Sequence, residues 1–591
     1  PGACTDHPEV ARRMGGFLRA TARHFRERSG LVLWDIWNEL RWNIHCDGYV
    51  CHCAHTLAAF RAWLRTRHGD LAGLDRAWHR RYADWADVMP GKVPGRPYTE
   101  QMAFATFLQE RAEAHLRWRA EIFRAEGGGK PVFAHGQTST IDQIGSPTVF
   151  QQAVCRGNDW EHVKALDGYG VSHFPLWGAQ DDTAFMLRVE SSAAAAGEKP
   201  MWLSELQGGA ANYGHAIARP VSAALQQRWL WMGMAAGAKG VIFWSWTDEV
   251  FGREATGFGL AGRDGCAEER IAALARLRVV VDRERQTLAD YRPDPARVGV
   301  FFSAPTYHLE TAEAGMAAKA RDGIHGWLRA CMRARHPATV LEGGSLGGLD
   351  ALELLVLPGA SVVPEAAVAP ILAWVRAGGT LVVEADVEAW STEGFYRAEP
   401  ADRPLLHALG IAFVGRSPLE EASANLSWGE AGPVIRTGWF LTPLAEPRNE
   451  TDGAVRARDA HGRALGLERR VERGRVIALG TFAGLAYETD KATTFETWVA
   501  HLCGGGASAG PVTDAPASVL WRSGRAGAKR LVFLVNGDES APAAVRVRLP
   551  SAGAPREWLR DAHWTLDADG FWRGEVPAGG VAVIESEAAF T

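Results

Sequence analysis

Two acidic residues stand at the ends of strand-like apolar runs, 166 positions apart in the chain. Glu39 closes the run Leu31-Val-Leu-Trp-Asp-Ile-Trp-Asn-Glu39, and Glu205 closes Met201-Trp-Leu-Ser-Glu205. A charged group beside buried strand residues costs several kcal/mol unless it is paired or exposed in a cleft. Either residue alone is equally compatible with an ordinary carboxylate at a strand end. Two carboxyls delivered to one cleft are the equipment of a glycosidase, with one as acid/base and one as nucleophile.

The elements that must position these carboxyls alternate between strand-like and helix-like segments through residues 1–290. We expect strands at 31–37, 131–135, 166–171, 201–205 and 240–246, and helices at 8–29, 56–68, 98–126 and 221–237. Such alternation predicts an α/β fold with a parallel sheet or a (β/α) barrel. A closed barrel needs eight strands, and its C-terminal strand ends form the floor of the active site. Five strands therefore indicate either an open sheet or three βα units upstream of Pro1.

Two further parts follow the first 290 residues. A second, smaller α/β domain is expected over 296–503, with parallel strands at 297–302, 352–358, 379–384 and 475–480 and a helix at 364–377. Residues 504–511 are rich in glycine and have the composition of a linker. Short alternating runs at 530–536 and 580–584 then predict a small antiparallel β-domain over 512–591.

The residues around the two acids carry a family resemblance. Asn38 precedes Glu39 in Trp34-x-x-x-Asn38-Glu39, and its amide is placed to hydrogen-bond a sugar hydroxyl near the reacting carbon. The other two segments are Glu205-Leu-Gln-Gly-Gly-Ala-Ala-Asn-Tyr213 and Gly252-Arg-Glu254-Ala-Thr-Gly-Phe-Gly-Leu260. With these segments the sequence resembles glycoside hydrolase family 42, the β-galactosidases, over nearly the whole chain.

The resemblance implies a role for each of these residues. Glu39 is the expected acid/base at the end of barrel strand 4, and Glu205 the expected nucleophile at the end of strand 7, so that strands 4 to 8 are present. Glu254 falls on a Glu that contacts substrate hydroxyls, and Tyr213 on an aromatic position that is usually Trp. Gly257 stands where the family has His, which removes one polar contact and weakens the case for strict galactose specificity.

The activity implied is retaining hydrolysis of terminal β-D-galactosides by double displacement. For retention the two carboxyls should lie about 5–5.5 Å apart. The expected substrate is a small carbohydrate, and no cofactor is expected in the catalysis. Two alternatives stay open: a hydrolase of another β-linked glycoside, such as an arabinoside or fucoside, or a non-catalytic sugar-binding or assembly protein. The intact pair Glu39 and Glu205 argues against the last, because a binding module has no need of both.

The rest of the chain shares the resemblance. The middle domain looks like the family's amidotransferase-like trimerisation domain, which implies a homotrimer, and the C-terminal part looks like its small β-domain. An active amidotransferase would carry a Cys at the turn after the strand 352–358. This chain has Gly359-Ala360 there, so we expect no catalysis in the middle domain.

Four of the eight cysteines fall in the first 53 residues: Cys4, Cys46, Cys51 and Cys53. With His45, His52 and His55 close by, they have the composition of a zinc site, since thiolate and imidazole ligands suit tetrahedral Zn²⁺. Some members of the resembled family bind zinc through four Cys. Thr56 stands at the last of those positions, so Cys46 or His55 would be the fourth ligand. Such a site would be structural; free thiols are the alternative.

Composition excludes several classes of function. The formal charge of −5 and the lack of a long basic run argue against a general nucleic-acid surface. No apolar run approaches the ~20 residues that span a bilayer. The chain starts at Pro1 without an initiator Met or signal-like segment, so we expect that its natural N-terminus is absent, and we expect a cytoplasmic protein. His135 and His173, near strand ends, are candidates for lining the cleft or for buried structural histidines.

Overall fold

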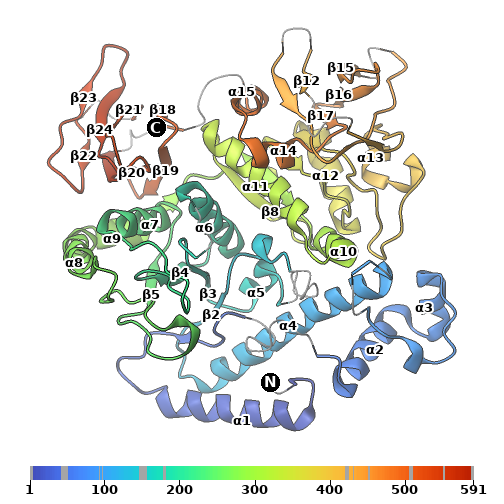
Figure 1. Ribbon diagram of the computed structural model, residues 1–591, viewed down its shortest axis with the longest axis horizontal. Helices are drawn as coiled ribbons and strands as arrows, with labels where there is room; N and C mark the ends of the chain where they lie inside the picture. The colour runs from blue at the N-terminus through green and yellow to red at the C-terminus, as the bar shows by residue number, and fades with distance from the viewer. Residues whose placement is uncertain are drawn as a thin grey trace. The chain divides into compact units, whose positions relative to one another are not determined.

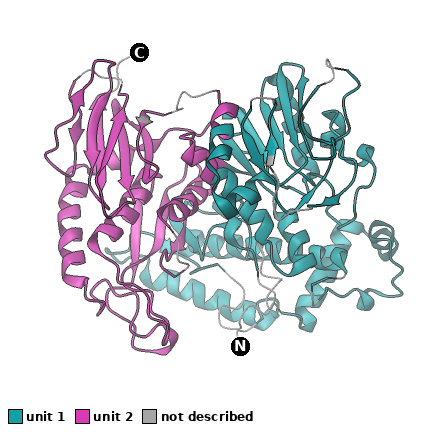
Figure 2. Ribbon diagram, turned by 45° about the horizontal axis from the view of Figure 1, so that its top comes forward, with its two compact units in different colours: residues 1–168, 298–328, 340–498 teal, residues 169–297, 329–339, 499–591 magenta. Residues whose placement is uncertain are grey.

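The computed structural model describes residues 4–40, 51–91, 94–95, 97–145, 156–177, 181–419, 425–429, 432–449, 453–504, 510–549 and 553–587. The chain divides into two compact units (Figure 2). Unit 1 comprises residues 1–168, 298–328 and 340–498, and unit 2 comprises residues 169–297, 329–339 and 499–591. Four elements run across a boundary between these ranges: β3 (Gly168–His173), α11 (Ala318–Arg333), β8 (Ala338–Glu342) and α15 (Thr493–Leu502).

The N-terminal part of unit 1 is mainly helical (Figure 1). Its elements are α1 (Pro8–Phe25), β1 (Trp34–Asp35), α2 (Ala54–His68), α3 (Leu71–Trp78), α4 (Tyr98–Glu126), β2 (Val132–Gly136) and α5 (Asp159–Lys164). A core of Phe60, Leu64, Trp78, Phe104 and Phe107 packs α2 and α3 against α4. The long amphipathic segment 98–126 thus forms the helix that its pattern predicts.

Two predicted elements are shorter than expected. The helix predicted over 8–29 ends at Phe25, because the N–H groups of Arg28 and Leu31 bond carbonyls only three residues back and so leave the helical pattern. The strand predicted over 31–37 is reduced to β1, which pairs with β2 in parallel at Trp34↔Val132 and Asp35↔Phe133. Beyond Asp35 the chain still bonds to β2, but it does so irregularly as it approaches Glu39.

The second part of unit 1 is built on a mixed sheet with the strand order β15-β16-β17-β10-β9-β7-β8. The pairs β7–β9, β9–β10 and β10–β17 are parallel, as the sequence predicted, and β15–β16–β17 is an antiparallel extension. The strands are β7 (Val298–Phe302), β9 (Leu354–Leu357), β10 (Thr380–Val383), β15 (Ala454–Arg458), β16 (Ala464–Val471) and β17 (Gly474–Leu479); the helices are α10 (Ala304–Ala314), α12 (Glu365–Ala377), α13 (Pro404–Ala408) and α14 (Ala483–Asp490). Two small hairpin-like sheets pair β11 (Ser417–Pro418) with β14 (Phe440–Leu441) and β12 (Asn425–Ser427) with β13 (Val434–Arg436).

The first part of unit 2 continues the alternation of strands and helices. Its elements are α6 (Asp182–Ala196), β4 (Met201–Gln207), α7 (Ala223–Ala235), β5 (Gly240–Trp244), α8 (Ala267–Arg283) and α9 (Arg285–Asp290). Strand order is β1-β2-β3-β4-β5, and each described pair is parallel. This parallel arrangement is the half-barrel sheet that the five strand-like runs predicted.

The C-terminal part of unit 2 is an all-β region of two antiparallel sheets, with the orders β18-β21-β24-β23 and β22-β25-β20-β19-β6. Its strands are β6 (Arg292–Pro293), β18 (Val512–Asp514), β19 (Val519–Ala526), β20 (Lys529–Asn536), β21 (Ala543–Val547), β22 (Arg556–Glu557), β23 (Thr565–Leu566), β24 (Trp572–Val576) and β25 (Val581–Glu587). Val532, Leu534, Val545 and Ile584 form part of the core between them. The antiparallel C-terminal domain predicted from the sequence is thereby confirmed in kind; the three domain boundaries remain predictions.

One buried arginine ties this β-region to the helices of unit 2. Arg228 on α7 is 2% exposed and donates from Nε to Asp182 at 2.9 Å, from Nη2 to Glu539 at 2.7 Å and from Nη1 to the Gly579 carbonyl at 3.0 Å. Nearby, Trp231 of α7 packs on Phe533 of β20, with ring centroids 6.0 Å apart. A buried guanidinium is costly unless its N–H groups are hydrogen-bonded. Without the β-region, Arg228 would lose its bonds to Glu539 and Gly579.

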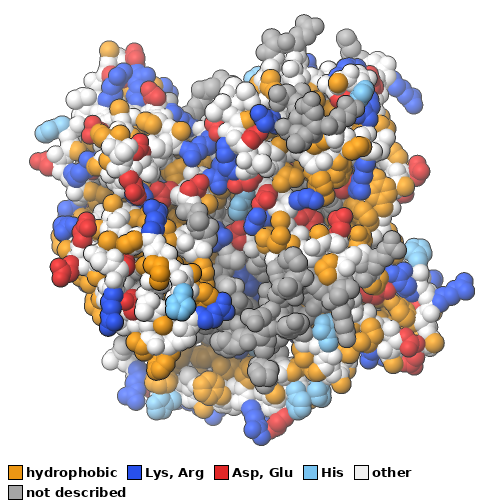
Figure 3. Space-filling view, in the orientation of Figure 1, with side chains coloured by type: hydrophobic (Ala, Val, Ile, Leu, Met, Phe, Trp, Pro, Cys, Tyr) orange, Lys and Arg blue, Asp and Glu red, His pale blue; other side chains and the backbone are white. Residues whose placement is uncertain are grey.

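Charges of both signs are mixed on one face of the molecule (Figure 3). On the face shown in Figure 3, Lys and Arg side chains are interspersed with Asp and Glu. Across the described part of the chain, no helix combines the length and the apolar character needed to cross a bilayer.

Candidate active site and cysteine cluster

Glu39 lies in a turn just beyond β1, in unit 1, and its backbone is left-handed with φ = 43°. Such a conformation is uncommon for a residue with a side chain and persists only where neighbouring groups enforce it. Asn38 beside it is exposed, and Glu39 itself is half-buried. Both side chains are therefore within reach of solvent, as groups that contact a substrate must be.

The segment that carries Glu39 is bonded on both sides to β2. The Ile36 N–H donates to the Phe133 carbonyl at 2.9 Å, and the Leu40 N–H to the His135 carbonyl at 3.0 Å. Arg119 of α4 donates to the Ile36 carbonyl at 2.9 Å, and its guanidinium lies 4.4 Å from the centre of the Trp37 ring. These contacts hold the turn at the strand end, where the sequence placed the first carboxyl.

Glu205 lies in unit 2, within β4, at an irregularity in the sheet. The register with β3 shifts between Val171↔Leu203 and Ser172↔Glu205, and the register with β5 shifts between Leu203 and Leu206. β4 therefore holds extra residues relative to both neighbours, which is a β-bulge. Bulges re-aim side chains and are frequent beside active sites. Glu205 is half-buried in this position.

Two neighbours of Glu205 escaped the sequence interpretation. A Cβ at Gly170 would lie 2.1 Å from the Trp202 carbonyl oxygen and 2.3 Å from the Ser204 hydroxyl, so only glycine lets β3 approach the bulge. Ser172, the register partner of Glu205, is 1% exposed, and among the described residues its hydroxyl has no hydrogen-bond partner. Neither residue has a sequence signal, since small residues are ordinary in parallel strands. His173 is buried at the end of β3, with its ring 5.4 Å from Phe185.

The segments that follow β3, β4 and β5 bring aromatic residues together in unit 2. The Tyr213 ring lies 5.2 Å from that of Trp177, and the Arg253 guanidinium lies 4.1 Å from the centre of the Tyr213 ring. Phe258 packs on Trp177 at 5.5 Å. Glu254, next to Arg253 in a short 3-10 helix, is half-buried. The structure thus brings Tyr213 and the segment of Glu254 together. Trp177 is 47% exposed, and an exposed aromatic face suits the apolar face of a sugar.

Gly257 is enclosed by the loop that follows Glu205. A Cβ at Gly257 would lie 2.7 Å from the Asn212 carbonyl oxygen, and the Asn212 amide itself donates to the Thr256 carbonyl at 2.9 Å. The loop therefore has no room for a side chain at position 257. Gly257, which stands where the resembled family has His, is therefore required by the path of the backbone.

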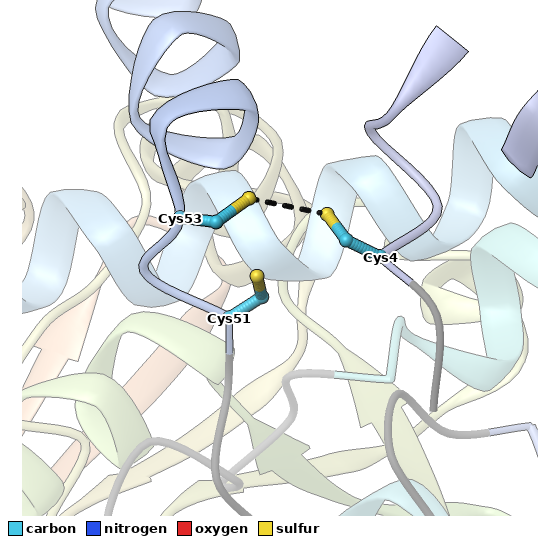
Figure 4. A group of neighbouring side chains, drawn as sticks. All are labelled: Cys4, Cys51 and Cys53. Atoms are coloured by element: carbon cyan, nitrogen blue, oxygen red, sulfur yellow. Dashed lines mark hydrogen bonds between the residues drawn. The ribbon is translucent and has the colours of Figure 1, made fainter. Parts of the chain in front are cut away.

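Three of the four predicted zinc ligands converge in unit 1 (Figure 4). The Sγ atoms of Cys4, Cys51 and Cys53 all lie within 4.8 Å of one another, and those of Cys4 and Cys53 are 3.5 Å apart. Two thiolates on one tetrahedral zinc would be about 3.8 Å apart, given a Zn–S distance of about 2.3 Å. Cys46 lies outside the described residues. The donor set thus fits a zinc ion in type and spacing.

The other candidate for a fourth ligand points elsewhere. The His55 ring packs on His7 at 4.4 Å, and in the described part of the chain only the three cysteines form the close donor group. Thr56 stands beside the thiols, with its hydroxyl 3.4 Å from Cys4 Sγ, and donates to Asp6 at 2.6 Å. Asp6 in turn pairs with Arg111.

The thiols differ in acidity. Burial raises the pKa of Cys4 to about 11. Burial acts in the same direction on Cys53, but hydrogen bonds from the Thr56 backbone, Cys51, the Thr56 hydroxyl and Cys4 outweigh it and lower the pKa of Cys53 to about 7. A cysteine binds a metal ion as its thiolate. With a pKa of about 7, Cys53 is partly in the thiolate form near neutral pH.

Glu39 lies four residues beyond β1, and Glu205 lies within β4, two residues before its C-terminal end, so each carboxylate is near the C-terminal end of a parallel strand. Carboxylates at such positions of a (β/α) sheet are typical of carbohydrate-active enzymes. Comparison with known proteins gives a family likeness. Residues 1–278, a little less than half of the chain, match the sequence model of the β-galactosidases, glycoside hydrolase family 42.

Individual relatives are distant. β-Galactosidase LacZ of Heyndrickxia coagulans is 22% identical over 279 residues, which are 45% of this chain and 38% of that protein. β-Galactosidase YesZ of Bacillus subtilis is 21% identical over 492 residues, which are 81% of this chain and 69% of that protein. The match to the first of these relatives spans less than two thirds of its length.

Solved structures establish the fold. The β-galactosidase from Bacillus circulans sp. alkalophilus superposes with a TM-score of 0.81 at 14% identity, covering 99% of this chain and 83% of that one. The chain thus shares the fold of that β-galactosidase along nearly its whole length.

Proposed function

We propose that this protein is a retaining glycoside hydrolase that releases terminal β-D-galactosyl residues. The observation that supports this most is the bulge in β4, which holds Glu205 near the C-terminal end of the strand, within the segment that matches the β-galactosidase model. A half-buried carboxylate near the C-terminal end of a parallel strand has the setting of a glycosidase nucleophile.

In the proposed mechanism Glu205 attacks the anomeric carbon while the leaving-group oxygen takes a proton from Glu39. A covalent glycosyl–enzyme intermediate results. Glu39, now a carboxylate, removes a proton from water, which attacks the anomeric carbon and releases Glu205 and the sugar. Asn38 and Glu254 hold substrate hydroxyls, and Tyr213 stacks on a sugar face.

The finer architecture is part of the same proposal. Strands β1 to β5 correspond to strands 4 to 8 of a (β/α)8 barrel, and residues 296–503 to an amidotransferase-like domain that assembles three chains. The turn after β9 carries Gly359-Ala360 where an active amidotransferase would have its Cys. Gly359 there is left-handed, with φ = 54°, and a Cβ would lie 3.1 Å from the Phe482 ring.

We also propose that Cys4, Cys51 and Cys53 hold a structural zinc ion with Cys46 as the fourth ligand. A zinc ion with four protein ligands has no open position for substrate, so it would fix the segment between Glu39 and α2 without entering the chemistry. Catalysis itself then needs no cofactor.

The test is a panel of nitrophenyl glycosides with the intact chain. We expect the β-D-galactoside to be cleaved fastest, with a β-configured first product by NMR, and Glu205→Gln to lose nearly all turnover. Glu198→Gln is the matched control, since Glu198 is an exposed carboxyl just before the other end of β4.

The alternatives appear as distinct outcomes of the same panel. Preference for the α-L-arabinoside or β-D-fucoside would change the substrate and keep the mechanism. Full activity in Glu205→Gln would falsify the assignment of the nucleophile. Binding of galactose without cleavage of any glycoside would make the protein a sugar-binding module.

A further inference from the structure

The turn that holds Glu39 is strained, and a single residue of β2 spans it. With φ = 43°, Glu39 occupies the left-handed region, which is unfavourable for an L-residue with a side chain. Such a cost is sustained only by contacts on both sides of the residue. The position of the carboxyl therefore depends on what the flanking residues bond to.

His135 makes three contacts with that segment. The imidazole Nδ1 of His135 lies 2.6 Å from Asp35 Oδ2. The backbone N–H of His135 donates to the Trp37 carbonyl at 3.5 Å, and its backbone carbonyl accepts the Leu40 N–H at 3.0 Å. The first two contacts precede Glu39 in the chain and the third follows it. His135 is 3% exposed, so its ring has little freedom to turn away.

The side-chain contact adds what the backbone bonds lack. The 3.5 Å bond to Trp37 is long and weak, whereas a 2.6 Å contact between imidazole and carboxylate has the length of a charge-assisted bond. Asp35 Oδ1 also accepts the Trp37 N–H at 3.4 Å, so the carboxylate links the ring of His135 to the backbone two residues before Glu39.

We infer that His135, through Asp35, is a positioning residue for the acid/base Glu39. The inference rests on the proposed function and adds a residue to its machinery: His135 touches neither the substrate nor the reacting atoms, and acts by fixing the turn that aims the Glu39 carboxyl at the leaving-group oxygen. Loss of the imidazole should therefore impair proton donation and leave nucleophilic attack by Glu205 largely intact.

The leaving group of the substrate separates these two effects. Phenyl β-D-galactoside needs a proton on its departing oxygen, and 2,4-dinitrophenyl β-D-galactoside does not. For His135→Ala we expect kcat/KM to fall about 10- to 100-fold on the phenyl substrate, part of what general acid catalysis contributes, and by no more than about threefold on the dinitrophenyl substrate. Asp35→Asn should show the same split, smaller in size.

The controls make each outcome decisive. His308→Ala removes a histidine that is 2% exposed on α10 and bonded to Thr106; both substrates should be unaffected by it. An equal loss on both substrates in His135→Ala, or no loss, overturns the positioning role. If His135→Ala does not fold, the split in Asp35→Asn decides. An unmodified chain that cleaves neither galactoside fails at the proposed function, which is a different result.

Discussion

At the scale of single residues, backbone geometry does as much for the two carboxyls as their chemistry. Glu39 needs a left-handed turn and Glu205 needs a bulge. Each is a local departure from regular structure that neighbouring residues must permit. At Glu205 that permission comes from Gly170, which leaves room for the Trp202 carbonyl and the Ser204 side chain.

Gly170→Ala should therefore disturb the nucleophile without touching it. Because the new methyl group would meet a backbone oxygen, we expect a loss of about 1–3 kcal/mol in the free energy of unfolding, as for other overpacked sites. Turnover should fall as well, because the bulge must shift. Urea unfolding and kcat measure the two effects. In the control Gly347→Ala the new Cβ meets nothing within 4 Å, so neither stability nor kcat should change. A fully active Gly170→Ala would show that the bulge does not depend on glycine at position 170.

The candidate site residues came from two kinds of sequence signal, and their roles remain predictions. Glu39 and Glu205 each close a strand-like apolar run, whereas Tyr213 and Glu254 were identified only because their segments resemble motifs of the family. The bulge, Gly170, Ser172 and the role of His135 were not predictable, because register between strands is a property of pairs of segments. A sequence pattern describes one strand at a time.

At the scale of elements, helix starts decide what the cysteines can do. Cys53 is the N-cap of α2, with extended backbone and no side-chain cap bond. Its Sγ instead points at Cys4. Serine would normally be the better cap, since its hydroxyl accepts from the first turn of the helix. A cysteine at this N-cap position, with no capping bond, indicates that the Cys53 side chain has a role other than capping α2.

Cys53→Ser separates a metal site from free thiols by the sign of its effect. If zinc is bound, the variant should lose metal and melt several degrees lower. Without metal, serine should leave the melting temperature unchanged or raise it, by a capping gain of about 1 kcal/mol or less. Elemental analysis and calorimetry with a chelator give both readouts. Cys266→Ser, at the N-cap of α8, is the matched control and should keep the metal.

A buried carboxyl makes the middle domain sensitive to pH. Glu384 follows β10 and accepts from Trp327 Nε1 and the Gly484 N–H, both at 2.8 Å, while burial raises its pKa to about 7. Between about pH 4.5 and 7 the Glu384 carboxyl is therefore protonated in the folded state and ionised in the unfolded state. Its contribution to stability is present below about pH 4.5 and is lost as pH rises to about 7.

Glu384→Gln should therefore stabilise the protein at high pH. The amide oxygen can keep both hydrogen bonds and cannot ionise, so the gain over the unmodified chain should grow between pH 5 and 7 and then level off. At about 1.4 kcal/mol per pKa unit, its upper bound is about 3 kcal/mol. Melting curves at pH 5 and pH 8 test this. A gain of equal size at both pH values would show that the carboxyl does not titrate in that range.

At the scale of the whole molecule, the structural match to the Bacillus circulans β-galactosidase covers 99% of the chain and so is not confined to the half-barrel. The parallel strands β7, β9, β10 and β17 were predictable because their apolar runs are continuous. The division into two compact units was not, since each unit combines segments far apart in the chain.

Assembly is the remaining prediction at this scale. If residues 296–503 act as the proposed trimerisation domain, light scattering at micromolar concentration should give three times the 64.1 kDa of one chain. Closed rings are a common solution for such domains. A monomer across that concentration range would contradict the proposal and would leave the assignment of Glu205 untouched.

The three bonds of Arg228 limit how this architecture can be rearranged. A domain can be exchanged freely by recombination only if its removal leaves no buried polar group of the remaining chain without a partner. Here the host helix α7 keeps a buried cation whose partners Glu539 and Gly579 reside in the departing β-region. A replacement domain would have to bring a carboxylate and a carbonyl to the same two places. Exchange of the C-terminal β-region for a domain without these two groups should therefore destabilise α7.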